Sequence, residues 1–218
     1  MFNLLKKHKL NFTEWVNYKK TLPVFSYLFH PIFIPLYAAL YYFFWNSSYY
    51  SGPEKFVAIF QIAIITLIIP ILIFFILRVT GQVDSLMVGN ISQRKIPLAI
   101  QCFLTFILLK KSITLAHFPE FHYFFLGGLC SLIIAFIFLF FNAKASLHMI
   151  GISILTVFVI GLSIHNQNRD LIVVAFLVLM NGFVASSRLA LKAHTPKELV
   201  VGFLLGILPQ LFLFIFWL

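Results

Sequence analysis

The sequence predicts an all-α integral membrane protein, a polytopic bundle of six or seven transmembrane helices. The first observation is the composition: 61% of the 218 residues are hydrophobic, 18% are aromatic and only 10% are charged. The second is a mean hydropathy of +1.01, which soluble globular domains do not reach. The third is a series of uncharged runs close to the length of about 20 residues that an α-helix needs to cross a bilayer.

Six uncharged runs are long enough to cross a membrane as helices, since the tolerated length is roughly 17–25 residues. They are 23–45, 56–77, 121–141, 146–164, 171–187 and 199–218. A seventh run, 96–109, is shorter and lies between Arg94–Lys95 and Lys110–Lys111. Lysine stems can extend the reach of such a short span, so we count it as a crossing.

The charge of the chain bears on its partners and its location. Sixteen basic and six acidic residues give a net charge of +10, but so apolar a chain has no polar surface on which to bind nucleic acid. We expect a basic interfacial segment at 1–22 and a single transmembrane domain at 23–218, with no cleaved signal peptide. The expected partners are the bilayer and its lipids, and the expected location is a bacterial-type inner or plasma membrane, crossed several times.

The polar connections sort onto two faces if each run crosses once. The N-terminal segment, 78–95, 142–146 and 188–198 fall on one face; 46–55, 110–120 and 165–170 fall on the other. The first face carries twelve of the sixteen basic residues, which the rule that cytoplasmic loops are positive explains. That rule does not explain the histidines on the same face, His148 and His194.

The most specific stretch, 187–198, supports two interpretations. Thr195, Pro196 and Glu198 have the spacing of a capping box that opens the last helix, so the carboxylate can serve helix initiation alone. Alternatively, His194 stands just before a helix N-terminus with Glu198 one turn away and Arg188 nearby, an arrangement suited to phosphate. The carboxylate would then fix the tautomer of the imidazole.

Two further segments on this face have the chemistry of an anion site. In the stretch 142–148, Ser146 can donate a hydrogen bond, Lys144 can neutralise negative charge and His148 can titrate at the start of a helix. At Arg94, close before Pro97, a guanidinium offers a planar fork to two phosphate oxygens.

The order Arg-x-x-Pro, Ser-x-His and Ser-Arg-x5-His-x3-acid resembles the type 2 phosphatidic acid phosphatase (PAP2) superfamily, integral-membrane lipid phosphatases related to vanadium haloperoxidases. The resemblance covers about 78–218. The third motif of that superfamily usually ends in Asp, where this chain has Glu198; the second is usually Pro-Ser-Gly-His, where this chain has 145–148 as Ala-Ser-Leu-His. The first is usually Lys-x6-Arg-Pro: Arg94 aligns, Met87 takes the lysine position and Pro97 comes two residues late.

The resemblance implies a PAP2-like core and hydrolysis of a lipid phosphate monoester or a polyprenyl pyrophosphate, with no metal and no cofactor. It implies His194 as the nucleophile that forms a phosphohistidine, Glu198 as its orienting partner and His148 as general acid and then base. Substrate phosphate would be bound by Arg188, Arg94 and Ser146, with Lys144 as a substitute for the missing lysine. The alternative is a non-catalytic PAP2-like membrane protein that binds or transports lipid, or a degenerate enzyme.

The side of the membrane stays open, because related phosphatases place this site outside the cytoplasm whereas the basic N-terminal segment argues for a cytoplasmic face. Asp84 has no assigned role. The pairs Gly127-Gly128 and Gly202-x3-Gly206 predict close helix packing. Four polar residues within apolar runs predict hydrogen bonds between helices, namely Gln61, Gln101, Asn181 and Gln210. Four other histidines are expected at the membrane interface rather than in the site, namely His30, His117, His122 and His165.

Overall fold

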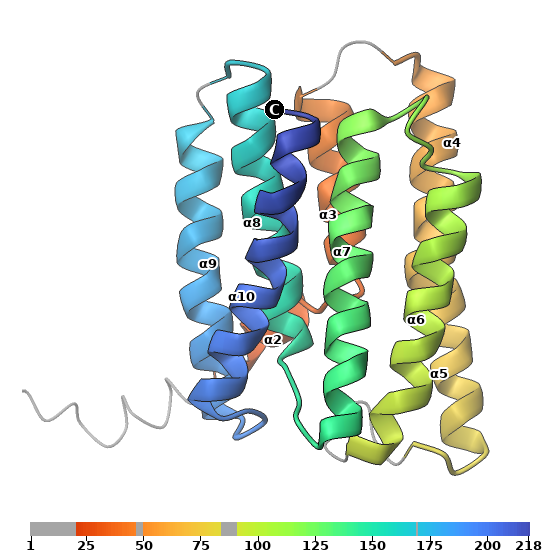
Figure 1. Cartoon of the computed structure of the whole chain (residues 1–218), viewed down its shortest axis with the longest axis vertical. Coiled ribbons are helices and arrows are strands. Elements are labelled where there is room, and N and C mark those ends of the chain that lie inside the picture. The colour runs from red at the N-terminus through yellow and green to blue at the C-terminus, as the bar shows by residue number, and fades with distance from the viewer. Residues whose placement is uncertain (1–20, 47–49, 84–90, 169) are drawn as a thin grey trace, which may run out of the picture.

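The computed structural model describes residues 21–46, 50–83, 91–168 and 170–218. Within these ranges the chain forms helices and no strand, which confirms the predicted all-α bundle. Figure 1 shows the long helices standing side by side. The predicted basic segment falls almost wholly outside the described residues.

The described part of the chain is a series of helices. In chain order they are α2 (Pro23–Leu28), α3 (Ile34–Leu40), α4 (Gly52–Ala63), α5 (Ile69–Val79), α6 (Ile91–Lys111), α7 (Pro119–Phe138), α8 (Leu147–His165), α9 (Leu171–Ala190) and α10 (Pro196–Leu213). Two π-helical stretches extend them: Tyr41–Asn46 continues α3, and Ile64–Ile68 joins α4 to α5.

Among the described residues, five helical segments are long and apolar enough to cross a membrane, so the chain is an integral membrane protein. They are Gly52–Val79, Pro119–Phe141, Leu147–His165, Leu171–Ala190 and Pro196–Phe216. Helix α6 has a comparable length but carries basic residues at both ends. It runs beside α7 as one uninterrupted helix, so the residues before it and after it lie at different ends of the bundle (Figure 1).

The connections therefore gather at two ends, as the alternation predicts (Figure 1). One end, called here the site end, holds the end of α5, the start of α6 and the loops 142–146 and 191–195. The other, the opposite end, holds the start of α4, the connection between α6 and α7, the end of α8 and the start of α9. Candidate site residues from distant parts of the sequence thus share one end.

The first apolar run, 23–45, is not the single helix expected. Helix α2 ends after one and a half turns, and the backbone at Phe29 leaves helical geometry before α3 begins at Ile34. The cause is Pro31, which has no N–H to donate and disfavours the helical conformation at His30. The resulting turn lies at the site end.

Helix α8 is the centre of the bundle, with 72% of its apolar stretch buried, against 11% for the rod Gly52–Val79. It packs against α3, α7, α9 and α10. The closest approach is to α10 at Gly202 and Gly206, where an added Cβ would meet backbone atoms of α8. Two of the four predicted polar links between helices are confirmed: Asn181 donates to Thr156 at 2.7 Å, and Gln210 donates to the carbonyl of Phe124 at 2.8 Å.

Candidate phosphate site

The site end holds a histidine and a carboxylate in direct contact. Helix α9 ends at Ala190 and α10 begins at Pro196, so His194 lies in the short loop between them, only 7% exposed. Its Nδ1 lies 2.7 Å from Oε2 of Glu198. Because an ionised carboxylate only accepts hydrogen bonds, Nδ1 carries the proton and Nε2 keeps its lone pair. The imidazole is therefore fixed in the tautomer that a nucleophile requires.

The same carboxylate oxygen also forms the cap of α10. Oε2 of Glu198 accepts from the backbone N–H of Thr195 at 3.4 Å, while the Thr195 hydroxyl accepts from the backbone N–H of Glu198 at 3.3 Å. Lys144 from the 142–146 loop adds a cation 3.6 Å from that oxygen. The geometry is therefore compatible with both the capping and the tautomer-fixing interpretation, since Oε2 of Glu198 contacts the His194 ring, the Thr195 N–H and Lys144.

The environment of His194 favours the neutral ring. Burial lowers the pKa of His194 below its usual value, and the positive charges of Arg94 and Arg188 lower it further, although the hydrogen bond to Glu198 opposes them. A neutral imidazole with a free Nε2 is the form that can attack phosphorus.

Arg188 is the most unusual residue at the site end. It lies in the last turn of α9 and is only 3% exposed, yet its Nε and Nη1 atoms have no hydrogen-bond partner among the described residues. Its charge acts on three rings, His30, His148 and His194, and Arg94 lies close enough to repel it. Buried N–H groups of a charged side chain that lack hydrogen-bond partners cost free energy, which a bound anion would offset.

His148 approaches from α8. It is the second residue of that helix, and its Nε2 donates to the backbone carbonyl of Ser26 in α2 at 3.1 Å. The ring also packs edge to face against His30, with centroids 5.0 Å apart and planes at 88°. Two elements, the start of α8 and the α2–α3 turn, thus hold the imidazole in place.

Ser146 lies where the sequence expects it but has a structural partner. Its hydroxyl accepts from the backbone N–H of Met149 as the N-cap of α8, and its own backbone N–H donates to the carbonyl of Glu198 at 3.2 Å. The side chain is fully buried. This residue therefore joins the first turns of α8 and α10, and Lys144 likewise faces the carboxylate of Glu198.

The structure adds two residues that the sequence does not predict for the site, His30 and Ser26. The Oγ of Ser26 lies 2.5 Å from Oγ of Ser187, which fastens α2 to α9 directly beside Arg188. The available signal was Pro31, which ends α2 early and turns His30 toward α8. His30, which the sequence places at the membrane interface, thus also contacts the His148 ring.

Two of the other histidines have partners at the opposite end. His122 bonds to the carbonyl of Ile113 at 2.7 Å, and His165 lies 3.5 Å from Glu120. Met87, at the lysine position of the first motif, and Asp84 lie outside the described residues. Comparisons with known protein families, with curated proteins and with solved structures found no match.

Proposed function

We propose that this chain is a membrane lipid phosphatase that hydrolyses a lipid phosphate monoester or a polyprenyl pyrophosphate through a phosphohistidine. The observation that carries the proposal is the buried guanidinium of Arg188, whose Nε and Nη1 atoms have no hydrogen-bond partner among the described residues, near the His194 imidazole whose Nδ1 contacts Glu198. A phosphate bound to Arg188 and Arg94 would have its phosphorus close to a neutral Nε2. The resemblance of three motifs to the PAP2 superfamily supports the same chemistry.

The proposed reaction has two steps. In the first, Nε2 of His194 attacks phosphorus and the bond to the leaving oxygen breaks, the ester oxygen of a monoester or the bridging oxygen of a pyrophosphate, while His148 in its protonated form gives that oxygen a proton and becomes neutral. In the second, His148 takes a proton from water, whose oxygen attacks phosphorus, and the bond to His194 breaks. Arg188 and Arg94 stabilise the charge on the phosphoryl oxygens in both steps.

We also propose that the chain crosses the membrane several times, with α3 and α6 added to the five long apolar helices. The site end would then lie at a lipid–water boundary, which suits a lipid because its chains stay in hydrocarbon while its phosphate enters the site. The bacterial-type inner or plasma membrane stays a prediction.

The test is phosphate release by the purified protein from phosphatidic acid and from a polyprenyl pyrophosphate. We expect release that is lost in His194→Ala and in Arg188→Ala and retained in His117→Ala, a matched control at the opposite end. A radiolabelled phosphate that stays on the protein after alkaline denaturation and leaves in acid would identify the phosphohistidine. Equal release by the wild type and His194→Ala would contradict the mechanism.

One observation favours a second candidate, a protein that binds lipid phosphate without hydrolysing it. The Nε2–H of His148 already donates a hydrogen bond to the Ser26 carbonyl, so the proposed acid must exchange partners to reach a leaving group. A binding protein would show thermal stabilisation by inorganic phosphate that depends on Arg188, without phosphate release from either lipid. The two measurements together separate the candidates.

A further inference from the structure

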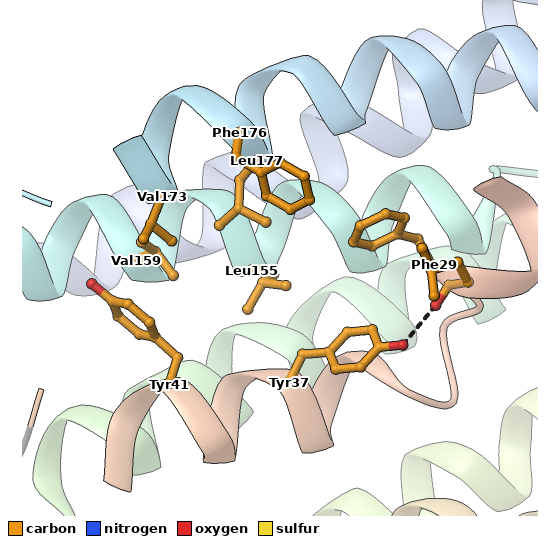
Figure 2. Close-up of a pocket in the computed structure, with 9 residues that line it drawn as sticks. Phe29, Tyr37, Tyr41, Leu155, Val159, Val173, Phe176 and Leu177 are labelled. Carbon is orange, nitrogen blue, oxygen red and sulfur yellow. Dashed lines mark hydrogen bonds between the residues drawn. The ribbon is translucent and has the colours of Figure 1, made fainter. Parts of the chain in front are cut away.

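An apolar groove opens on the side of the bundle above the candidate phosphate site. It has a volume of about 310 Å³ and lies among α3, α8 and α9, with the end of α2 at its lower limit. Figure 2 shows side chains from these helices pointing toward one another across it. The lining residues are Leu28, Phe29, Tyr37, Tyr41, Leu155, Val159, Val173, Phe176 and Leu177.

The two tyrosine hydroxyls of this lining already donate hydrogen bonds within the protein. The Tyr37 hydroxyl donates to the carbonyl of Leu28 at 2.9 Å, the bond drawn in Figure 2, and the Tyr41 hydroxyl donates to Asp170 at 2.6 Å. Only rings and aliphatic groups face the space. Water needs polar partners to occupy such a space, so the groove suits hydrocarbon.

The position of the groove favours a lipid chain over a soluble ligand. The floor comes from Leu155 and Val159, near the middle of α8, and one wall from Val173 to Leu177 of α9. Both helices are candidate membrane spans, so the groove lies at the depth of the hydrocarbon core. Leu28 and Phe176, at the rim, are half exposed, which leaves the groove open to surrounding lipid.

The groove is continuous with the site along two elements. On α8, Leu155 follows His148 by seven residues, about 10 Å along a helix. On the α2–α3 connection, Phe29 lines the groove while its neighbour His30 packs against His148. A phosphate near Arg188 and a chain in the groove can therefore belong to one molecule.

We propose that this groove binds one acyl chain of the lipid whose phosphate occupies the site. The inference rests on the proposed function for the place of the phosphate, but not on hydrolysis. The volume is at the small end of the range for ligand pockets, roughly 300–1,000 Å³, which suits one unbranched chain better than a methyl-branched polyprenyl chain. The α3–α9 side of the bundle is then the route by which the lipid enters from the bilayer.

The test is photochemical labelling in bilayers with phosphatidic acid that carries a diazirine near the middle of one acyl chain. We expect labelled peptides from the groove segments 155–159 and 173–177. Val173→Trp, at the groove wall, should lower labelling about tenfold or more, because an indole fills the space. Val178→Trp is the matched control on the same helix, 55% exposed and outside the groove, and should label like the wild type.

Binding of the acyl chain can be distinguished from hydrolysis with a variant, a control lipid and the phosphate-release assay. Labelling should persist in His194→Ala, since that variant keeps Arg188, and should be weaker for a diacylglycerol with the same chain, which has no phosphate to hold. If the wild type releases no phosphate but labelling is still lost in Arg188→Ala, the proposed hydrolysis is wrong and the proposed acyl-chain groove is supported. Labelling spread evenly over the exposed rod Gly52–Val79, equal labelling by the diacylglycerol, or stronger labelling by a polyprenyl probe would overturn the assignment.

Discussion

His30 and His148 pack ring against ring, 5.0 Å apart and nearly perpendicular, although 118 positions separate them in the sequence. This contact restricts the imidazole that the proposed mechanism uses as acid and base. We expect His30→Ala to lower kcat about tenfold to 100-fold through misplacement of the His148 ring, with a smaller effect on KM. His30→Phe keeps an aromatic contact and should recover most of kcat; steady-state kinetics on phosphatidic acid measure both. If His30→Phe is as impaired as His30→Ala, His30 acts through its nitrogen atoms instead.

Glu198 combines a cap with a chemical role, and two substitutions separate them. Glu198→Gln removes the carboxylate that fixes the His194 tautomer, so we expect turnover to fall about 10²–10⁴-fold. Thr195→Ala removes the capping hydroxyl and should cost about 1 kcal/mol of folding stability with little change in kcat. Thermal unfolding and phosphate release, measured on both variants, would show opposite patterns. Parallel losses in both measurements would mean that the carboxylate serves the helix alone.

Arg188 should destabilise the protein while its site is empty. Arg188→Met replaces a buried charge, whose Nε and Nη1 atoms lack hydrogen-bond partners among the described residues, by an apolar side chain of similar reach, so we expect the variant to be more stable by about 1–4 kcal/mol. It should also lose any stabilisation by inorganic phosphate. Thermal unfolding with and without phosphate measures both effects. A variant that is less stable than the wild type would indicate a structural partner for the guanidinium.

The pH dependence of the first step follows from the lowered pKa of His194. Because the neutral ring is the nucleophile, loss of phosphohistidine formation through protonation of His194 should begin only well below about pH 6.5, where an ordinary histidine becomes protonated. Arg94→Met removes a neighbouring cation, which favours the protonated ring and should move the acid limb to higher pH. Rapid-quench measurements across the pH range test this, even if Arg94→Met is slower throughout.

The same shift has a consequence for folding stability. Below about pH 6.5 the unfolded chain binds a proton at His194 that the folded chain resists. The contribution of this residue to stability is therefore fully present above that pH and decreases as the pH falls toward the lower pKa of the folded state. His194→Gln should reduce the difference between the unfolding temperatures at pH 7.5 and pH 5.5.

Gly202 sets the distance between the two halves of the site. An added Cβ there would lie 2.7 Å from the carbonyl oxygen of Ser146, a backbone atom that cannot give way. We expect Gly202→Ala to push α10 from α8 and to lower both stability and activity. Gly182→Ala, where nothing lies within 4 Å, is the matched control and should stabilise α9 by up to about 1 kcal/mol. Equal behaviour of the two variants would contradict this packing.

The five long apolar helical segments were predictable because each contains an uncharged run near bilayer length, and the last one also carries its capping signal at Thr195 and Glu198. The sorting of loops followed from alternation alone. Helix α9 was predicted to stop at Ser187 because Arg188 is charged, whereas the helix continues to Ala190 and buries that charge. The Arg188 guanidinium is buried by residues of α2, α6 and α8, and a hydropathy pattern along the sequence does not show which helices lie next to one another.

The site was predictable as a set of residues at one end but not in its contacts. Ser146 was expected to donate to phosphate, although a serine just before a helix is also a common N-cap, and the structure shows that cap. His30 was missed because its role depends on where Pro31 turns the chain. Such contacts arise from the packing of distant segments, so local sequence signals could not distinguish them.

The shared oxygen of Glu198 links assembly to reactivity. Helix α10 follows every other described helix in chain order, and the first turn of α10 and the aim of the His194 imidazole depend on that one atom. In a nascent chain that has inserted only α2 to α9, the His194 imidazole would therefore not yet be oriented by Glu198. Under the proposed function, such an incompletely inserted protein could not hydrolyse the lipids around it. Catalytic activity would begin only when α10 completes the bundle.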